Sequence, residues 1–439
     1  EKGRLMNTFS EKQHGQIIVI FAVALVALLA ITALAIDGGV IYSDRRYSQS
    51  AADASSLAGG GVAASTMDDL GVIYTEFTCT NSGVATARAN AVDAAISRAA
   101  SNNFPTLDGD IADQHGVETL CVNDGANFDK HIDVHTLISS TTNTSFAQIF
   151  TNGEYVNRVE AVVRVRPRTE FAFGNAIVAT SPNCQNSNEG GVWFDGDSNV
   201  VINGGGVFSN ACINAGGSAL SIDVTNGGIG YVTTYTENGS PTVDPAPEQA
   251  PAPMPDYGIP EPICPTTTPK PHTGQGTINP GNYSRIKLTN GDLTLNPGLY
   301  CMSGDLNISG GHLIGDGVTI FFVSGSTNFK DDFGVAGNPE IDLYAPTEAN
   351  LVGNAIPGVV IYTTTSGNVT LLGNGDSTYE GIIYAPHADV DVGGTAGVNP
   401  TFNTQIVGKA VKIHGNATIN INYNNNNPYT WSPRLDVVK

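Results

Sequence analysis

The sequence predicts an α+β protein with an N-terminal transmembrane helix, a small α/β membrane-proximal module and a C-terminal all-β region. Three observations predict this fold class. A run of apolar residues occupies positions 17–36, and an alanine-rich segment at 85–104 is followed by an alternating segment at 155–167. From about residue 184 onward, short β-branched runs alternate with Gly, Asn and Asp, and helical patterns are absent.

The apolar run is interrupted by one polar side chain, Thr32. A helix of about 20 apolar residues spans a hydrocarbon core of ~30 Å. A single segment that crosses lipid must also be a helix, because a helix satisfies its own backbone N–H and C=O groups with internal hydrogen bonds. A cleaved signal peptide and a buried helix of a soluble domain are the alternatives, but the run is long for the first and has no polar face for the second. We therefore expect an uncleaved anchor, whose residues include Ile17, Phe21, Leu25, Leu29 and Ile36.

Charges on the two sides of this run predict its orientation. Lys and Arg are the only charged residues before it apart from Glu1 and Glu11, whereas Asp37 and Asp44 follow it. The positive-inside rule places the N-terminus in the cytoplasm and the bulk of the chain in the extracytoplasmic space or on the cell surface. Arg45 and Arg46 weigh against this orientation because they lie close to the far membrane face, while the large acidic remainder favours it.

The residues around and after the run carry a recognisable pattern. Residues 37–60 read DGGVIYSDRRYSQSAADASSLAGG, and a Gly-Gln pair precedes the apolar run. This combination resembles the N-terminal anchor of TadG/TadE-like proteins of the tight-adherence (Flp) pilus machinery. The matching residues are Gly15, Gln16, Asp37, Arg45, Arg46, Gln49, Ala51, Ala52, Asp53, Ala54, Leu57, Ala58 and Gly59, with Ser55 where the family usually has Ala.

The resemblance implies a structural role in pilus assembly, with the membrane and other tight-adherence pilus components as partners. The small residues of the pattern permit close helix packing. That packing is either against the chain's own ectodomain or against another assembly component, and the sequence leaves both open.

Length, charge and composition limit the remaining possibilities. A chain of 439 residues corresponds to two or three domains. A formal net charge of −21 excludes nucleic acid as a partner, because a phosphate backbone binds cationic surfaces. Composition changes predict the segments 1–64 (cytoplasmic tail, anchor and juxtamembrane helix), 65–180 (α/β module), 181–238 (β-rich), 239–273 (Pro-rich linker or insertion) and 274–439 (β-solenoid-like ectodomain).

The six cysteines all follow the predicted anchor, and none belongs to a C-x-x-C motif. An even number of cysteines outside the cytoplasm favours disulfides over metal ligation. Scattered buried thiols are the alternative. The simplest connectivity joins neighbours along the chain, which predicts the pairs Cys79–Cys121, Cys184–Cys212 and Cys264–Cys301.

The all-β region predicts stacked strands. Similar apolar triplets at 360–362, 382–384 and 405–407 recur roughly every 22 residues, a period typical of repeat architectures. A β-solenoid is therefore predicted, because each coil buries the apolar face of its neighbour. A β-sandwich, which also has many short strands, is the alternative. The stretches PGLYC, GIIYAP and IVGK are also similar to a region that follows such anchors in other bacterial surface proteins, which implies a surface-exposed or pilus-associated ectodomain.

Residues that carry chemistry are few. The carboxylate pairs at 331–332 and 389–391, with Lys409 as the nearest cation to the second, keep a polysaccharide-active β-helix enzyme as an alternative. Residues 195–199 start like a calcium loop but lack its later Gly and Glu, which favours a plain turn. His131 and His135 have an i, i+4 spacing without an evident helix, so we expect solvated side chains.

These features predict a membrane-anchored structural or assembly protein of a tight-adherence pilus system, and not an enzyme. We expect no cofactor and no metal site, and surface attachment, to a glycan or to a host or other substratum, as the outcome. A filament-forming pilin is the alternative from the same machinery. Mature pilins of this type usually carry Glu at the fifth position after the cleaved Gly, whereas Ile20 is fifth after Gly15, which argues against that processing.

Overall fold

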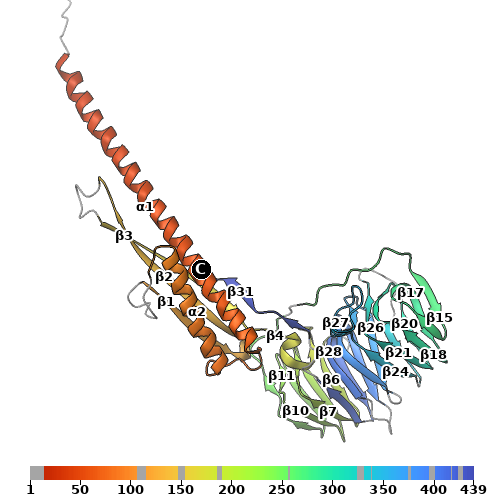
Figure 1. The fold of residues 1–439 in the computed structure, drawn as a ribbon. Helices are drawn as coiled ribbons and strands as arrows, with labels where there is room; N and C mark the ends of the chain where they lie inside the picture. The colour runs from red at the N-terminus through yellow and green to blue at the C-terminus, as the bar shows by residue number, and fades with distance from the viewer. Residues whose placement is uncertain are drawn as a thin grey trace, which may run out of the picture.

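The structure, a computed structural model, describes residues 14–105, 115–146, 154–184, 190–255, 258–323, 331–337, 339–373, 377–394, 401–416, 418–423 and 429–439. It has three parts: a long N-terminal helix, a small antiparallel sheet that the helix covers, and a large sheet of parallel strands. Figure 1 shows the helix projecting away from the small sheet, with the large sheet at the opposite end of the molecule.

The small sheet and two helices form a compact unit, which we call the module. Helix α1 (His14–Asp69) is continuous over 56 residues, and α2 (Ser82–Ser101) packs against its second half. The Asn81 side chain caps α2 by accepting a hydrogen bond from the Gly83 N–H. The sheet has the order β1-β2-β3-β31, from β1 (Gly116–Asp124), β2 (Asp129–Asn143), β3 (Glu154–Arg166) and β31 (Arg434–Val437).

The module therefore joins distant parts of the chain. Strand β31, near the C-terminus, pairs antiparallel with β3. The apolar core between the helices and the sheet includes Met67, Ala91, Ala95, Val134 and Val163, all buried. Strands β1 and β2 lie within the predicted α/β module (65–180), but the sequence analysis identified no strand at these positions, because only one of their faces is apolar.

A short segment leads from the module into the large sheet. It contains β4 (Thr169–Glu170) and the 3-10 turn Phe171–Gly174, and β4 pairs with β30 (Thr430–Trp431). The first strands of the large sheet are β5 (Asn175–Ala179), β6 (Gly191–Asp195), β7 (Asn199–Asn203), β8 (Gly206–Ser209), β9 (Ile213–Gly217), β10 (Ser221–Thr225), β11 (Ile229–Tyr231), β12 (Tyr235–Gly239), β13 (Thr242–Asp244) and β14 (Glu248–Gln249).

The later strands are β15 (Lys270–Thr273), β16 (Gly276–Ile278), β17 (Gly281–Leu288), β18 (Asp292–Leu295), β19 (Gly298–Met302), β20 (Leu306–Ile308), β21 (His312–Asp316), β22 (Val318–Phe322), β23 (Asp331–Val335), β24 (Glu340–Tyr344), β25 (Val359–Thr363), β26 (Asn368–Gly373), β27 (Thr378–Gly394), β28 (Thr401–Gly415) and β29 (Thr418–Asn422). Together with β5–β14 they make a single 25-stranded sheet.

Strands of this sheet pair in parallel with the strand from the next turn of the chain. Strand β5 pairs with β8, β6 with β9 and β7 with β10, so three successive strands form a unit that we call a rung. Register matches inward residues with inward residues, as where Val200 lies beside Ile222 and Ile320 beside Ile361. The stacked inward side chains form the largest apolar core of the protein.

The order of the rungs in space differs from their order in the chain. Strands β28 and β29, at the end of the later series, pair with β5, β6 and β7, the start of the earlier series. An asparagine ladder crosses this junction. Asn203 donates to the Asn422 side chain at 2.9 Å, and Asn422 donates to the Asn403 side chain at 3.2 Å. The stack therefore runs from β15–β17 through β28–β29 to β12–β14.

The Pro-rich segment between β14 and β15 crosses the outside of this stack, and we call residues 250–255 and 258–269 the strap. Its Met254 and Ile259 are buried against an outer apolar face of the large sheet. The Asn210 side chain accepts the Met254 N–H at 2.7 Å, and the Tyr362 hydroxyl donates to the Ile259 carbonyl at 2.5 Å. The strap thus connects the two ends of the stack and packs against rungs from both series.

Three disulfides join the neighbouring cysteines, as the simplest connectivity predicted: Cys79–Cys121, Cys184–Cys212 and Cys264–Cys301, with Cα–Cα distances of 5.8, 5.7 and 6.0 Å. The described chain has no free cysteine. The first bond links the segment before α2 to β1, and the third fastens the strap to β19.

Replacing both Cys264 and Cys301 by Ser is expected to loosen the strap and to lower stability by about 2–4 kcal/mol, because the bond closes a loop in the unfolded chain. Amide hydrogen exchange checks this: peptides from the strap exchange faster, while β5–β10 keep their protection. The matched control replaces Cys79 and Cys121, which should affect exchange in the module alone. Unchanged exchange in the strap of the first variant would contradict the role assigned to this disulfide.

Candidate membrane-anchor and assembly site

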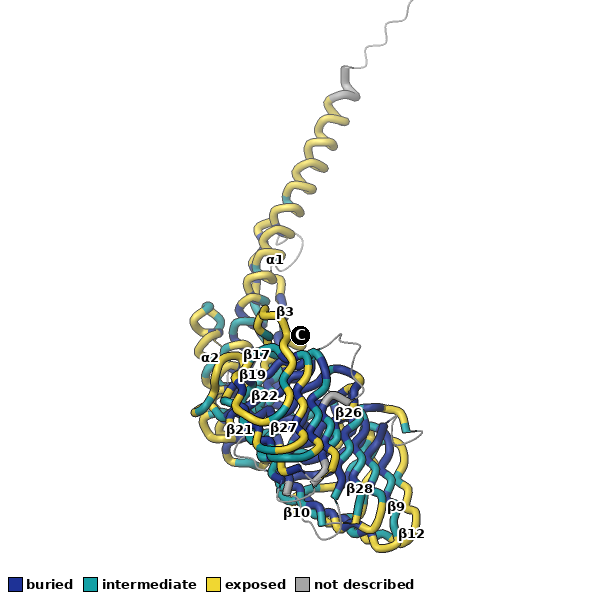
Figure 2. Tube along the Cα trace, turned by 90° about the vertical axis from the view of Figure 1, so that its right-hand side faces the viewer, coloured by how far each residue is buried: buried dark blue, intermediate teal, exposed yellow. Residues whose placement is uncertain are grey.

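The part of α1 that precedes Asp37 contains no buried side chain among those that the structure describes. Its most apolar window has a mean hydropathy of 3.0 and is 0% buried, so α1 is long and apolar enough to cross a membrane. The residues expected to face lipid, from Phe21, Leu25 and Leu29 to Ile36, are 66%, 45%, 61% and 46% exposed. The side chain of Ile17, like the surroundings of Gly15, lies outside the described residues. Figure 2 shows this exposed half beside the buried interior of the β region.

The polar group within the apolar half is satisfied inside the helix. The Thr32 hydroxyl donates to the Leu28 carbonyl at 2.8 Å. This removes a donor that would be costly to expose to hydrocarbon. The segment before Asp37 therefore exposes apolar side chains and no unbonded side-chain donor over its described length.

Asp37 lies where α1 first meets the module, and it is 4% exposed. One carboxylate oxygen accepts the Ser145 N–H at 2.9 Å, and the other accepts the Phe146 N–H at 3.0 Å. Hydrogen bonds from backbone N–H groups to a carboxylate are among the stronger ones in proteins. This aspartate of the family pattern thus fastens the segment after β2 to the end of the exposed helix.

Asp44 lies two turns further along the same side of α1. Its Oδ2 accepts hydrogen bonds from the Ser140 and Thr142 hydroxyls at 2.6 and 2.7 Å and from the Asn157 amide at 2.7 Å. Burial by itself raises the pKa of Asp44, but these three donors outweigh burial and hold the pKa below its usual value. The sequence analysis used Asp44 only as a flanking charge, because its partners lie about a hundred residues away in the chain.

The small residues of the family pattern pack inside the module. The buried positions on this face of α1 are Ala51, Ala52, Ser55, Ser56, Gly59, Gly60 and Ala63. A Cβ at Gly59 would lie 2.8 Å from the Ala91 carbonyl oxygen and 2.9 Å from a methyl of Val134, so α2 and β2 approach α1 more closely than a side chain permits. Of the two packing partners that the sequence left open, these residues meet the chain's own module.

Ser55, which stands where the family usually has Ala, has a specific partner. Its hydroxyl donates to the Ala95 carbonyl of α2 at 2.6 Å, and the neighbouring Ser56 donates to the Ala161 carbonyl of β3 at 2.9 Å. Gln49 donates to Asp53 at 2.8 Å and to the Glu160 carbonyl at 3.1 Å. Polar residues of α1 thus bond to both elements that cover it.

Three residues of the family pattern point away from the module. Arg45, Arg46 and Leu57 are exposed, and the Arg46 guanidinium lies 6.0 Å from the ring centroid of Tyr42. The two arginines follow the apolar segment by about two to three helical turns. The pattern therefore divides into a buried side, which holds the fold, and an exposed side, which is available to lipid headgroups or to another protein.

The large sheet gathers the charged residues that the sequence analysis considered for catalysis. Lys409 lies 2.9 Å from Asp389, and His414 lies 2.8 Å from Asp391, on the outer side of β27 and β28. Burial raises the pKa of Asp389, and the hydrogen bond from His414 to Asp391 raises the pKa of the imidazole. Each carboxylate has its own cation, which is the arrangement of paired surface charges. The side chains at 331–332 lie outside the described residues.

The other candidates have structural partners. Asp197, in the loop that starts like a calcium site, accepts the Ser218 and Ala219 N–H groups at 3.0 Å and so fixes a turn. His131 is on a strand and is 1% exposed, so the expectation that it is solvated was wrong. Its Nδ1 lies 2.9 Å from Asp129, and the alternating face of β2 turns it toward the charged residues of β3.

One cluster was missed by the sequence analysis. His312 on β21 and Glu340 and Asp342 on β24 bring their possible ligand atoms within 4.8 Å of one another, close enough for one metal ion to contact all three. His312 Nε2 is 3.0 Å from Asp342 Oδ2, so these two side chains also pair directly with each other on the outer face of the large sheet. His312 lies 30 positions before Asp342 in the chain. The pairing of β21 with β24, one rung further along the stack, brings the three residues together.

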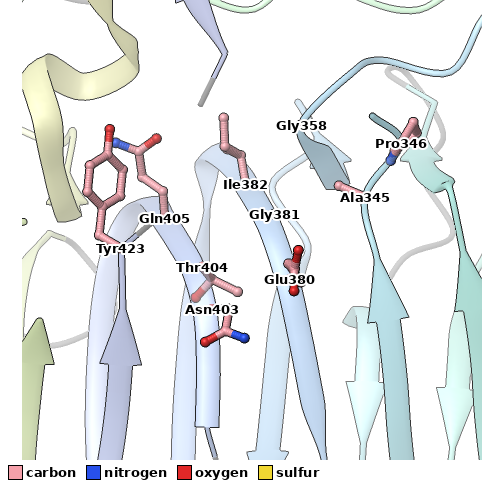
Figure 3. A pocket seen from close by; sticks show the side chains of 10 residues that line it. All are labelled: Ala345, Pro346, Gly358, Glu380, Gly381, Ile382, Asn403, Thr404, Gln405 and Tyr423. Atoms are coloured by element: carbon pink, nitrogen blue, oxygen red, sulfur yellow. The ribbon is translucent and has the colours of Figure 1, made fainter. Parts of the chain in front are cut away.

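A small pocket lies along β27 and β28, between the loop residues Ala345, Pro346 and Gly358 on one side and Tyr423 on the other (Figure 3). Gln405, one of its lining residues, is 3% exposed and donates to the Phe171 carbonyl at 2.7 Å and the Asn175 carbonyl at 2.6 Å. The pocket has a volume of about 30 Å³, which is too small for a saccharide unit. The two hydrogen bonds of Gln405 connect β28 to the segment that leads from the module.

Two family models match the chain. Residues 15–65 match the family described as putative Flp pilus-assembly TadE/G-like, which confirms the resemblance predicted from the N-terminal pattern. Residues 274–426 match a domain of unknown function, DUF7305. No curated protein and no solved structure matches the chain. The chain thus carries a TadE/G-like anchor region followed by a β-rich region that includes this second domain.

Gly59→Val is expected to destabilise the module by about 1–3 kcal/mol, because its side chain would overlap the Ala91 carbonyl and Val134. The matched control is Gly61→Ala, where an added Cβ has no atom within 4 Å and a helical Ala is favoured over Gly. Thermal unfolding of the purified chain in detergent measures both. Equal effects from the two substitutions would contradict the close packing of this face.

Asp44→Asn is expected to lower stability at neutral pH by about 1–3 kcal/mol, because it removes the charge that three donors face. The folded pKa of Asp44 lies below its unfolded value, so the stabilisation is complete above the unfolded pKa and is lost as pH falls through the folded pKa. Unfolding measured from about pH 7 to about pH 3 should therefore show the two proteins converging in acid.

The control for this titration is Asp93→Asn, an exposed carboxylate on α2. It should follow the wild-type stability across the whole pH range. A constant difference between wild type and the Asp44 variant down to the lowest pH would show that the network does not depend on the carboxylate charge.

Proposed function

We propose that the chain is a membrane-anchored structural component of a tight-adherence (Flp-type) pilus system that displays a β-rich ectodomain for surface attachment. The observation that carries this proposal is the division of α1 into an exposed apolar half and a half packed inside the module. A helix of this kind holds an ectodomain at a fixed position over the membrane. The TadE/G-like match over the same residues supports the pilus assignment.

Charge and disulfides support an orientation with the N-terminus in the cytoplasm and the bulk outside. The flanks of the apolar run follow the positive-inside rule. Three disulfides in the part that follows the anchor suit an oxidising compartment. In this orientation Asp37 lies at the outer membrane face, and Arg45 and Arg46 lie within reach of anionic headgroups.

The parallel pairing of strands three apart supports a β-solenoid as the architecture of the ectodomain. We divide the chain into the anchor and juxtamembrane helix (1–64), the α/β module (65–180), a first β segment (181–238), the Pro-rich strap region (239–273) and the main solenoid (274–439). The outer faces of the rungs carry Asn, Thr and charged side chains, a composition that suits a surface glycan, a host surface or another substratum as the attachment target.

Two alternatives have particular observations in their favour. A filament-forming pilin would also need a helix with an exposed apolar half, because copies would pack those halves together, although Ile20 argues against the usual processing. A polysaccharide-active β-helix enzyme would use acidic and basic side chains on one outer face, such as Asp389 and Lys409. Their mutual pairing favours a structural role, so the assignment as a non-enzyme is retained.

The anchor is tested by Leu25→Arg with Leu29→Arg. Each charge at the centre of the span costs about 2.5–3.5 kcal/mol on insertion scales, so the variant is expected to leave the alkali-washed membrane fraction. The matched control, Leu25→Val with Leu29→Val, should stay in that fraction. Retention of the arginine variant would contradict a transmembrane anchor.

The pilus assignment is tested in the native cell by deleting the gene and by mass spectrometry of the N-terminal peptide. Loss of surface filaments on deletion, with the chain intact before Gln16 and found in membranes, is the expected result. A new terminus at Gln16 in sheared filaments would make the chain a pilin. Normal filaments and normal attachment in the deletion strain would overturn the proposed function.

A further inference from the structure

The two ends of the rung stack carry opposite charge. Residues 220–249, the acidic end, contain four carboxylates and no Lys or Arg: Asp223, Glu237, Asp244 and Glu248. Residues 270–288, the basic end, contain three strong cations and no Asp or Glu: Lys270, Arg285 and Lys287. All seven side chains are exposed. From Thr169 to Pro269 the chain has no Lys or Arg at all, so no strong cation of the first rung series reduces the charge of the acidic end.

These segments lie at the physical ends of the stack. Strands β12, β13 and β14 pair with β9, β10 and β11 on one side, and no described strand pairs with their other side. At the opposite end, β15 and β16 pair with β17 and β18 on one side alone among the described strands. Figure 1 shows β15 at one extremity of the large sheet and β10 and β11 near the other.

The end charges have no ion-pair partners in the described part of the chain. The ion pairs within 4.0 Å on the large sheet involve other residues, such as Asp389 with Lys409 and Asp195 with Lys412. Glu237 accepts a hydrogen bond from the Tyr235 hydroxyl, and Lys270 lies 5.3 Å from the ring centroid of Tyr283, but both contacts leave the formal charge uncompensated. The two ends therefore have complementary electrostatic potentials.

The chain already contains one contact between the ends of two rung series. At the junction of the two series, the edge strands β28 and β29 stack on β5, β6 and β7, although the segments are separated by most of the β region in sequence. The paired strands of all rungs run in one direction. The two ends of the stack therefore have matching strand polarity, so that an end of one copy can face the opposite end of another.

Prolines in the terminal rungs limit the kinds of interaction that could hold such a contact. Pro245 and Pro247 at the acidic end and Pro271 at the basic end remove N–H donors from the terminal rungs. Neither edge can therefore form a complete β-ladder with an added strand. Proline is a common means of protecting an exposed edge in this way. A contact between the ends would be held by complementary side-chain charge.

We propose that the acidic end of one copy docks against the basic end of a second copy, so that anchored copies associate head to tail in the plane of the membrane. A heterologous contact of this kind does not close by symmetry and extends into a row. Anchoring by α1 confines the copies to a surface, which raises their effective concentration. The inference concerns the β region alone and does not depend on the pilus assignment.

The test uses full-length chain purified in detergent micelles. Equal amounts of ¹⁴N- and ¹⁵N-labelled chain are mixed and treated with a carbodiimide, which joins a lysine amine directly to a carboxylate in contact with it. Mass spectrometry should find isotopically mixed cross-links from Lys270 or Lys287 to carboxylates of the acidic end. Their yield should fall steeply near 1 M salt, where the screening length is about 3 Å.

Charge reversal supplies the decisive comparison. One variant carries Lys270→Glu, Arg285→Glu and Lys287→Glu, and the other carries Asp223→Lys, Glu237→Lys, Asp244→Lys and Glu248→Lys. Each variant alone should lose association about tenfold or more, since like charges then meet. Mixing the two should restore it, because each presents ends complementary to the other. The control variant reverses both charges of an ion pair that lies away from the two ends, with Asp195→Lys and Lys412→Glu. It should associate like wild type.

Cross-links that are never isotopically mixed would overturn the proposal, as would association that both end variants retain. Failure of the mixed variants to recover would also overturn it, provided that each keeps the wild-type circular dichroism spectrum. None of these outcomes bears on whether the chain serves a pilus, because no other component is present.

Discussion

The structure depends on one helix that must satisfy two environments. Helix α1 is continuous. The residues before Asp37 are apolar and exposed, as a membrane-crossing segment requires, and those after it pack in a protein core. Apolar side chains and the internally bonded Thr32 meet the first requirement. Ala, Ser and Gly meet the second, because only small residues let α2 and β2 approach the helix closely. Continuity of the helix then fixes the module, and through it the β region, relative to the anchor.

The β region meets a different requirement, because its short strands must be stabilised without packing against a second sheet. Each rung is too small to bury its own apolar side chains, and stacking supplies the missing core. The chain enters this stack in its middle, at β5, and closes the gap with β28 and β29. The strap is the consequence of that route. The chain must pass from β14 at one end of the stack to β15 at the other, along the outside of the large sheet. Burial of Met254 and Ile259 against the apolar outer face stabilises this path.

The charged residues follow the same division between structural and exposed roles. Asp37 and Asp44 use their carboxylates to bind donors from the module, so they belong to the joint between anchor and fold. On the large sheet, Asp389 and Asp391 are each paired with a cation from the next rung. The acidic and basic ends differ from both, since their charges have no ion-pair partner in the described chain. The place of a charged residue in the fold, and not its type, separates these three behaviours.

The sequence by itself determined the anchor, its family pattern, the disulfide pairs and the repeated strands, because each depends on residues that are close in the chain or on a local period. The Pro-rich segment was also recognisable, since proline restricts the backbone wherever it occurs. The partners of Asp44, the place of β31 beside β3 and the strands β1 and β2 were not. These arise from contacts between segments about a hundred or more residues apart, and a one-sided sheet leaves only a weak pattern.

Only the tertiary structure decided that the small residues around Gly59 pack on the chain's own module, that His131 is buried, and that β28 meets β5. It also decided which strands stand at the ends of the stack. The physical reason is common to all of these. Local periodicity specifies which side of an element is apolar, whereas the identity of the surface that covers it depends on how distant segments are brought together.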